Sequence, residues 1–198
     1  MSLDYPFTIK AAVDRDYLDY VAACIERHAG EFMPNSFDPE RRKWWRFGED
    51  PVLDAKKHDL IARFGLPDWV PEPDFGDYIG WIAEGGSIHT HRDNAPRDKM
   101  HVRINVLVRK PDAGCVPVLD EQPIDIDLGD AWICLASQCW HAATPVVGKA
   151  PRNVVSYGMR IDRVTGLPLY AKYLGWRSAV ARAAPPTQTP PSEAATVQ

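Results

Sequence analysis

Residues whose side chains can bind a metal lie close together in the middle of the chain, in the run Ile88-His89-Thr90-His91-Arg92-Asp93-Asn94. Side chains alternate between the two faces of a β-strand, so a strand here would place His91 and Asp93 on one face, together with His89. His141 from a second strand would complete a set of two histidines and one carboxylate. Such a set holds non-haem Fe(II) on one face of the ion and leaves its other positions open. We therefore predict a metal site made of His91, Asp93 and His141.

The His-x-Asp pattern alone is weak evidence, because the two residue types fall two positions apart by chance in many chains. Its weight comes from the features around it. A Gly85-Gly86 turn precedes the pair, and Gly129-Asp130, His141, Pro145-Val146 and Arg152 follow it in order. Few unrelated chains would contain all of these features, so the combination favours a functional site.

Residues 77–162 resemble the Fe(II)/2-oxoglutarate-dependent dioxygenases. The segment from His141 to Arg152, His-x3-Pro-Val-x-Gly-x3-Arg, is similar to the distal-histidine and 2-oxoglutarate-arginine segment of the prolyl hydroxylase group, with one additional residue between histidine and arginine. The stretch 101–106 resembles the Arg-x-His strand of the aspartyl/asparaginyl hydroxylase group, with Asn105 in place of the histidine. The resemblance is to the superfamily and does not select one of these groups.

The resemblance implies an enzyme that uses Fe(II), 2-oxoglutarate and O2. It would hydroxylate a carbon of a second substrate while 2-oxoglutarate is converted to succinate and CO2. Arg152 would bind the distal carboxylate of 2-oxoglutarate, since a guanidinium can grip both carboxylate oxygens. Arg103 would meet the 1-carboxylate near the iron, with Asn105 beside it. Ser156 does not stand at the Arg-x-Ser spacing seen in some relatives, so it is not included in the expected site.

His89 has a second interpretation, because His89 and His91 on one face also match the way a cupin presents two metal ligands. A cupin would need a glutamate three or four positions later, and residues 92–96 read Arg-Asp-Asn-Ala-Pro. We therefore expect that His89 does not bind the metal itself. It would either hold a metal-binding side chain in its orientation or touch the substrate.

Other classes of protein remain open at this level. One is a cupin-like metal-binding isomerase or binding domain without oxygenase activity, and another is a non-catalytic jelly-roll module with structural histidines. For an oxygenase, a small metabolite or free amino acid is favoured as substrate over a peptidyl or protein side chain. The loops 94–100 and 110–114, with the aromatic segment near Trp44, would set substrate choice. Their residues do not identify the substrate.

The elements that must position these residues follow from the hydrophobic pattern. Helical periodicity predicts helices over 14–28, 51–64 and 165–182. Residues 31–50 show no regular period, and the prolines of 66–75 predict a linker without strand or helix. Short apolar runs between turn residues predict strands over 77–83, 87–93, 101–109, 115–119, 122–128, 130–136, 139–144 and 151–162. About eight antiparallel strands in two layers form a jelly roll. We predict a mainly β fold with flanking helices (α+β) and a double-stranded β-helix core.

The domain organisation follows from length and composition. A chain of 198 residues suits one domain. We assign 1–183 to it, with a helical N-terminal buttress and a core over about 77–162. The proline-rich stretch 184–198 is expected to be a disordered tail, because it has too little apolar surface to offset the entropy of ordering.

Charge and cysteine usage limit the partners and the compartment. Charged residues make up 25% of the chain, the net charge is −4 and no long block of one sign occurs, so neither nucleic acid nor membrane is an expected partner. No secretory leader or long apolar stretch is evident, which favours a soluble cytoplasmic protein with four reduced cysteines. The sequence leaves the oligomeric state open.

Overall fold

The sheet that supports the site is built on two long antiparallel strands, β7 (Lys99–Arg109) and β14 (Arg152–Asp162). The computed structural model describes residues 4–183. In the large sheet the strands follow the order β1-β11-β7-β14-β5-β3-β2, and β4 also pairs with β14. The other members are β1 (Thr8–Ile9), β2 (Met33–Pro34), β3 (Arg42–Arg46), β4 (Trp69–Pro71), β5 (Tyr78–Ile82) and β11 (Ala131–Cys134).

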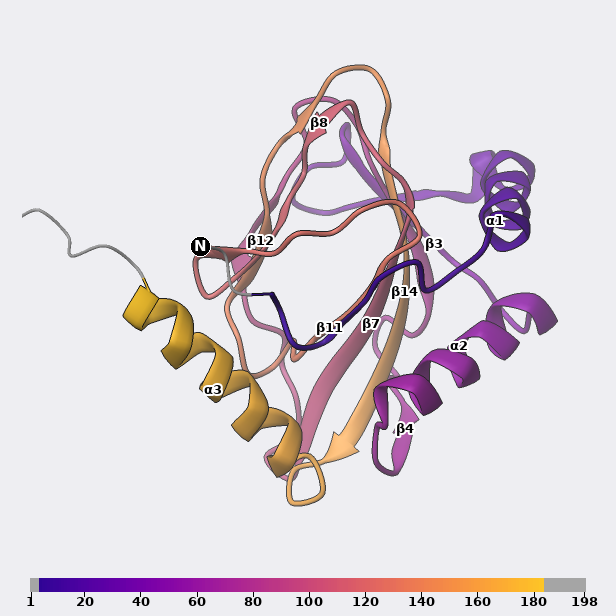
Figure 1. The fold of residues 1–198 in the computed structure, drawn as a ribbon. Coiled ribbons are helices and arrows are strands. Elements are labelled where there is room, and N and C mark those ends of the chain that lie inside the picture. Colours follow the sequence, from indigo (N-terminus) through magenta and orange to yellow (C-terminus); the bar gives the residue numbers. More distant parts are fainter. Residues whose placement is uncertain (1–3, 184–198) are drawn as a thin grey trace, which may run out of the picture.

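A smaller sheet faces the large one, in the order β10-β9-β12-β6 (Figure 1). Its strands are β6 (Ile88–His91), β9 (Pro117–Leu119), β10 (Gln122–Pro123) and β12 (His141–Ala143). A short ribbon of β8 (Ala113–Gly114) and β13 (Val146–Val147) lies at one end. Each of the eight predicted core strands contains or overlaps an observed strand, and the two facing antiparallel sheets confirm the jelly-roll prediction. The sheets do not close into a continuous barrel.

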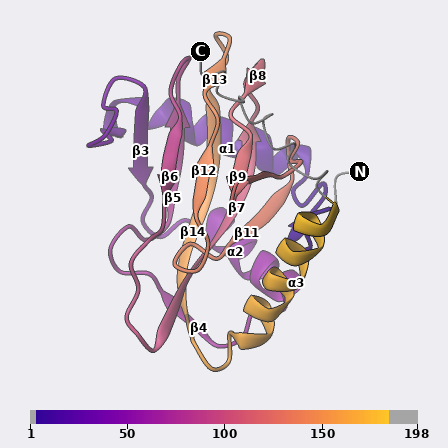
Figure 2. The same cartoon turned by 90° about the vertical axis from the view of Figure 1, so that its left-hand side faces the viewer.

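Within residues 4–183, three α-helices flank the sheets, as predicted: α1 (Arg15–Arg27), α2 (Pro51–Phe64) and α3 (Leu167–Ala183). The helices α1 and α2 lie against the outer side of the large sheet. The helix α3 lies on the opposite side of the molecule (Figure 1), beside β11 (Figure 2). Tyr157 of β14 joins the layers, because its hydroxyl bonds the hydroxyl of Tyr17 (2.8 Å) and the carbonyl of Leu53 (3.1 Å). Because side chains alternate along a strand, the residues next to Tyr157 in β14 face the other way, into the space between the two sheets.

Alternation along β14 decides which side chains face inward. Val155, Tyr157 and Met159 are fully buried in the main core. Arg152 and Val154 line the space between the sheets instead. Because strand side chains alternate, the outer face of β14 secures the helices while its inner face is free to carry a site.

Two segments are more ordered than the sequence pattern predicted. The predicted linker 66–75 is wrong in part, since β4 pairs with Met159–Ile161 of β14. It lies at the end of its sheet, where the missing donor of Pro71 is tolerated. Residues 31–50, which had no assigned period, contain the strands β2 and β3, and the short 3-10 helix η1 (Ala29–Glu31) begins just before them. The strand β3 pairs along its whole length with β5.

Other expectations concern features outside the core. All four cysteines are free thiols and buried. Within residues 4–183, no helix has both the length and the apolar character that crossing a bilayer requires. The expected tail 184–198 lies outside the described residues. The assignment of 1–183 to one domain stays a prediction.

Candidate active site

The three predicted metal ligands converge between the two sheets. His91 at the end of β6 pairs directly with His141 at the start of β12. Asp93 lies two residues beyond β6, and its backbone N–H donates to the carbonyl of Ala136 (2.9 Å), which fixes the chain as it leaves the strand. The ligand atoms of the three side chains all lie within 4.8 Å of one another. The structure thus brings together the residues that the sequence singled out.

Both histidines present the same ring nitrogen to the site. Nδ1 of His91 lies 2.8 Å from the carbonyl oxygen of His89, and Nδ1 of His141 lies 3.3 Å from that of Cys139. A carbonyl can only accept, so in each neutral ring Nδ1 carries the proton and Nε2 carries the free lone pair. Both Nε2 atoms face Asp93, at 3.5 Å and 3.8 Å from its Oδ1.

Asp93 is held by a histidine that the sequence analysis did not place in the site. Nδ1 of His101, a 2% exposed residue of β7, lies 3.1 Å from Oδ2 of Asp93. Its Nε2 lies 3.3 Å from Nη1 of Arg103. Arginine has no acceptor, so Nε2 of His101 must accept and Nδ1 must donate to Asp93. The second carboxylate oxygen is thereby engaged by the protein, while Oδ1 faces the histidine pair. The sequence does place His101 on the same strand face as Arg103, but its partnership with Asp93 depends on how the strands are arranged in space.

The ionisation of the three side chains follows from these contacts. Burial by itself raises the pKa of Asp93, but the hydrogen bond from His101 and the nearby His141 lower it below its ordinary value. Burial and the neighbouring His141 lower the pKa of His91. Burial opposes the positive charge of His141, yet Cys139 and Asp93 raise its pKa overall. The site therefore holds an ionised carboxylate beside imidazoles of which His91 favours the neutral form.

Arg103 is tied to the wall of the site by several acceptors. Its Nε donates to Oγ of Ser156 and its Nη2 to the carbonyl of Gly76, both at 2.8 Å, and Nη1 lies 3.8 Å from buried Glu72. A Cβ at Gly158 would lie 3.0 Å from Nη1 of Arg103 and 2.7 Å from the carbonyl of Gly76. Only glycine leaves room for this approach. Arg103 lines the cavity, and its binding of a 1-carboxylate stays a prediction.

Ser156 links the two predicted co-substrate residues of β7. Its hydroxyl accepts from Arg103 and donates to Oδ1 of Asn105 (2.7 Å). The spacing argument had left Ser156 out of the site. Its place on the inner face of β14, opposite Asn105 in the register, brings it in. The sequence could not reveal this pairing, because it depends on which strand lies beside which.

A cavity of about 420 Å³ connects the metal-ligand cluster with Arg152. Arg152 is 5% exposed, its guanidinium lies over the ring of Trp132 at 5.6 Å, and burial lowers its pKa. It has no ion pair with any described carboxylate. Among the described residues that line this main cavity, Asp93 is the one carboxylate. Arg152 is therefore a buried positive charge that faces an open volume.

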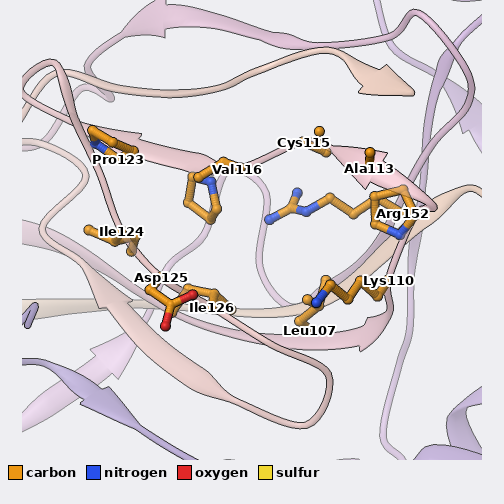
Figure 3. A pocket seen from close by; sticks show the side chains of 13 residues that line it. Leu107, Lys110, Ala113, Cys115, Val116, Pro123, Ile124, Asp125, Ile126 and Arg152 are labelled. Atoms are coloured by element: carbon orange, nitrogen blue, oxygen red, sulfur yellow. The ribbon is translucent and has the colours of Figure 1, made fainter. Parts of the chain in front are cut away.

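A second cavity of about 410 Å³ lies on the other side of Arg152 (Figure 3). Figure 3 shows the guanidinium of Arg152 beside Cys115 and pointing toward Val116, with Leu107 on the opposite wall. This side cavity contains none of the three metal-ligand residues. Its lining includes Lys110 and Asp125 besides Arg152 and is otherwise mostly apolar, so the candidate metal ligands are confined to the main cavity.

Aromatic residues form part of the lining of the main cavity. Phe37 packs on His89 with ring centroids 4.6 Å apart, and Trp44 lies near Phe75 and Tyr78. His89 is exposed, its ring centroid is 4.9 Å from that of His91, and it lies outside the cluster of ligand atoms. Trp45 points the other way and bonds Glu31. The aromatic segment thus contributes Trp44 to the cavity and Trp45 to the outer layer.

A second group of possible ligands shares His141. Cys134 and Cys139 lie beside it, with their sulfur atoms 3.9 Å apart and both thiols buried. Cys139 also lies 3.3 Å from the carbonyl of Leu135, to which its thiol donates. Of this second group, Cys134 and His141 also line the main cavity and Cys139 does not, whereas His91, Asp93 and His141 all line it.

No protein-family model and no curated protein matches the sequence. Solved structures are similar to it. The collagen prolyl hydroxylase of Paramecium bursaria Chlorella virus-1 is 14% identical, with 79% of this chain and 95% of that chain covered and a TM-score of 0.57. A prolyl hydroxylase of Trichoplax adhaerens is 15% identical (80% and 84% covered, TM-score 0.59). HygX of Streptomyces hygroscopicus is 12% identical (77% and 81% covered, TM-score 0.58). The chain therefore has the jelly-roll fold that these structures share.

Proposed function

We propose that the protein is an Fe(II)- and 2-oxoglutarate-dependent oxygenase that hydroxylates a carbon of a second substrate. The observation that carries this proposal is a single cavity with three convergent metal donors near one end and, toward the other, a buried arginine that has no ion pair with a described carboxylate. Two neutral imidazoles and one carboxylate are the donor set of non-haem Fe(II) sites that keep open positions. The overall reaction would convert 2-oxoglutarate, O2 and a C–H group to succinate, CO2 and an alcohol.

The residues present fit the metal. His91, Asp93 and His141 would hold Fe(II), and each has its other polar atom fixed by the protein through His89, His101 or Cys139. Such outer partners fix the orientation of ligands and raise metal affinity. When bound, Fe(II) would supply the oxidising chemistry with O2 and 2-oxoglutarate. The protein contributes position, charge and exclusion of water.

The co-substrate would lie along the main cavity. Arg152 would bind the distal carboxylate, because it is a buried guanidinium without a carboxylate partner among the described residues. Asn105 would contribute its amide near the middle of the cavity, where Ser156 holds its carbonyl oxygen. Arg103 would add positive charge near the 1-carboxylate while it also keeps His101 directed at Asp93.

The second substrate would enter on the aromatic side, past His89, Phe37 and Trp44. A small metabolite or amino acid is favoured, with a protein side chain as the alternative. The similar structures support both classes: the Trichoplax enzyme holds a peptide fragment, and HygX has been seen with nickel, 2-oxoglutarate and hygromycin B. His89 would touch this substrate or support His91.

A panel of candidate substrates, scored by 2-oxoglutarate consumption and succinate formation, tests the proposal. Succinate should form in a metal-dependent manner and in equal amount to the 2-oxoglutarate consumed. A cupin-like metal-binding domain would bind metal without forming succinate. The position of His89 outside the ligand-atom cluster favours the oxygenase over that alternative.

A further inference from the structure

A second arginine faces the same cavity at the level of Arg152. In the large sheet, Arg42 of β3 pairs with Ile82 of β5, and Ile82 pairs with Arg152 of β14. Paired residues in adjacent strands put their side chains on the same face of the sheet. Arg42, Ile82 and Arg152 therefore form one row across three strands, directed into the main cavity, which all three line.

The alternation along β3 supports this direction independently. Trp44, two residues after Arg42, lies near Tyr78 on the cavity side. Trp45, on the opposite face, packs against His28 near α1. Arg42 shares the face of Trp44, since side chains two residues apart in a strand point the same way. Lys43 shares the face of Trp45, with its ammonium over the ring of Trp81 (5.5 Å).

Arg42 has no ion pair with a described carboxylate, and no described residue accepts a hydrogen bond from its guanidinium. It is half-buried, and burial lowers its pKa. The charges of Arg42 and Arg152 also act on the same group: burial raises the pKa of the Cys115 thiol, while both guanidiniums oppose that rise. Two cations thus lie near one thiol, and the carboxylate of Asp38, which acts on Arg42 electrostatically, forms no ion pair with it.

Strands two apart in a sheet are separated by about 10 Å, so each arginine needs to cover about half that distance to meet on one anion. An arginine side chain is long enough to do so. A carboxylate between them would attract both guanidiniums and offset one of the two positive charges, and its two oxygens offer enough lone pairs to accept hydrogen bonds from both.

We infer that Arg42 and Arg152 together bind the distal carboxylate of the co-substrate, which makes Arg42 a specificity-determining residue for dicarboxylic 2-oxo acids. The inference rests on the proposed function. It assigns the second guanidinium to the co-substrate rather than to the second substrate, because Arg42 and Arg152 lie in one row and therefore at the same depth of the sheet.

Calorimetric titration of nickel-loaded protein tests the inference without turnover. The probes are 2-oxoglutarate and 2-oxopentanoate, which has the same chain length and a methyl group in place of the distal carboxylate. The variant is Arg42→Met, which removes the charge and keeps much of the length. Lys43→Met is the matched control: Lys43 also borders the main cavity, but its ammonium lies over the ring of Trp81 on the opposite face of the strand.

Arg42→Met should weaken 2-oxoglutarate at least about tenfold, a factor that corresponds to about 1.4 kcal/mol. Binding of 2-oxopentanoate should change less than about twofold, and Lys43→Met should change neither. Arg42→Lys should recover part of the loss, because the charge returns without the two-pronged grip. This partial recovery, with an unchanged thermal unfolding temperature, would separate a binding role from a folding defect.

Two outcomes would contradict the inference in distinguishable ways. If wild-type protein binds both acids equally, the proposed 2-oxoglutarate site fails and the inference fails with it. If wild-type protein and Arg42→Met prefer 2-oxoglutarate by the same factor while Arg152→Met loses the preference, only the role of Arg42 fails. The second guanidinium would then be free for an anionic second substrate.

Discussion

The two ends of the main cavity differ in how the protein completes them. At the metal end, each of the three ligand side chains has its second polar atom bound by another protein group: His89, His101 or Cys139. At the arginine end, Arg42 and Arg152 have no ion pair with any described carboxylate. One end is arranged before any ligand arrives, and the other leaves positive charge for a ligand to neutralise.

This difference fits two kinds of occupant. A resident metal needs fixed donors, because its affinity depends on the orientation of each ligand. A co-substrate that must be renewed at every turnover needs attraction and release, which unpaired cations supply. Variants at the two ends should therefore fail differently: at the first through metal, at the second through 2-oxoglutarate.

Asp93→Ala should give the largest effect, a loss of metal-dependent succinate formation. It removes one of three ligands and leaves His101 without its acceptor. The fold should persist, since Asp93 belongs to no hydrophobic cluster, and circular dichroism checks this. Asp16→Ala, at an exposed aspartate of α1 outside both cavities, is the control and should retain activity. Full activity in Asp93→Ala would refute the ligand assignment.

Arg152→Lys should raise the apparent 2-oxoglutarate constant about tenfold or more with iron saturating, while metal content stays unchanged. The positive charge survives, but the ammonium cannot grip both carboxylate oxygens. Steady-state kinetics with metal analysis of the same samples measures both quantities. An unchanged constant would move the anchor for the distal carboxylate elsewhere, with Arg42 as the next candidate.

His101→Phe should weaken metal binding by a factor of about 10–100, the usual cost of losing an outer partner of a metal ligand. His101→Asn should lose less, since its amide can replace the Nδ1 donor to Asp93. Equilibrium dialysis with Fe(II) under anaerobic conditions gives both affinities. Equal affinities in the two variants would limit His101 to a packing role.

Some parts of the site could be predicted from the sequence, and others could not. His91 and Asp93 lie in one short run, and the hydrophobic alternation around them is local, so the strands and the predicted metal ligands could be read directly. The partnership of His101 with Asp93 and the row of Arg42 and Arg152 depend on strand order and register. Local sequence patterns do not encode strand order or register. The residues of β3 also lack the clear alternation of apolar and polar side chains that would have predicted a strand there.

Glu72→Gln should have the smallest effect, on stability alone. Burial raises the pKa of Glu72, but backbone N–H groups of residues 74–76 lower it below its ordinary value of 4.5. A carboxylate with a depressed pKa stabilises the fold above its unfolded pKa and loses that contribution as pH falls through the folded value. Urea unfolding should show wild type more stable than the variant at pH 7, with the difference shrinking below about pH 4.5. A difference independent of pH would assign the effect to packing.

The link between the two ends is tested most directly by titrating 2-oxoglutarate into metal-free and nickel-loaded protein. One molecule that reaches from metal to arginine gains contacts at both ends, so the loaded protein should bind it at least about tenfold more tightly, in a one-to-one ratio. In Asp93→Ala this gain should disappear, while weak binding through Arg152 remains. Equal affinity with and without metal in the wild-type protein would contradict the account.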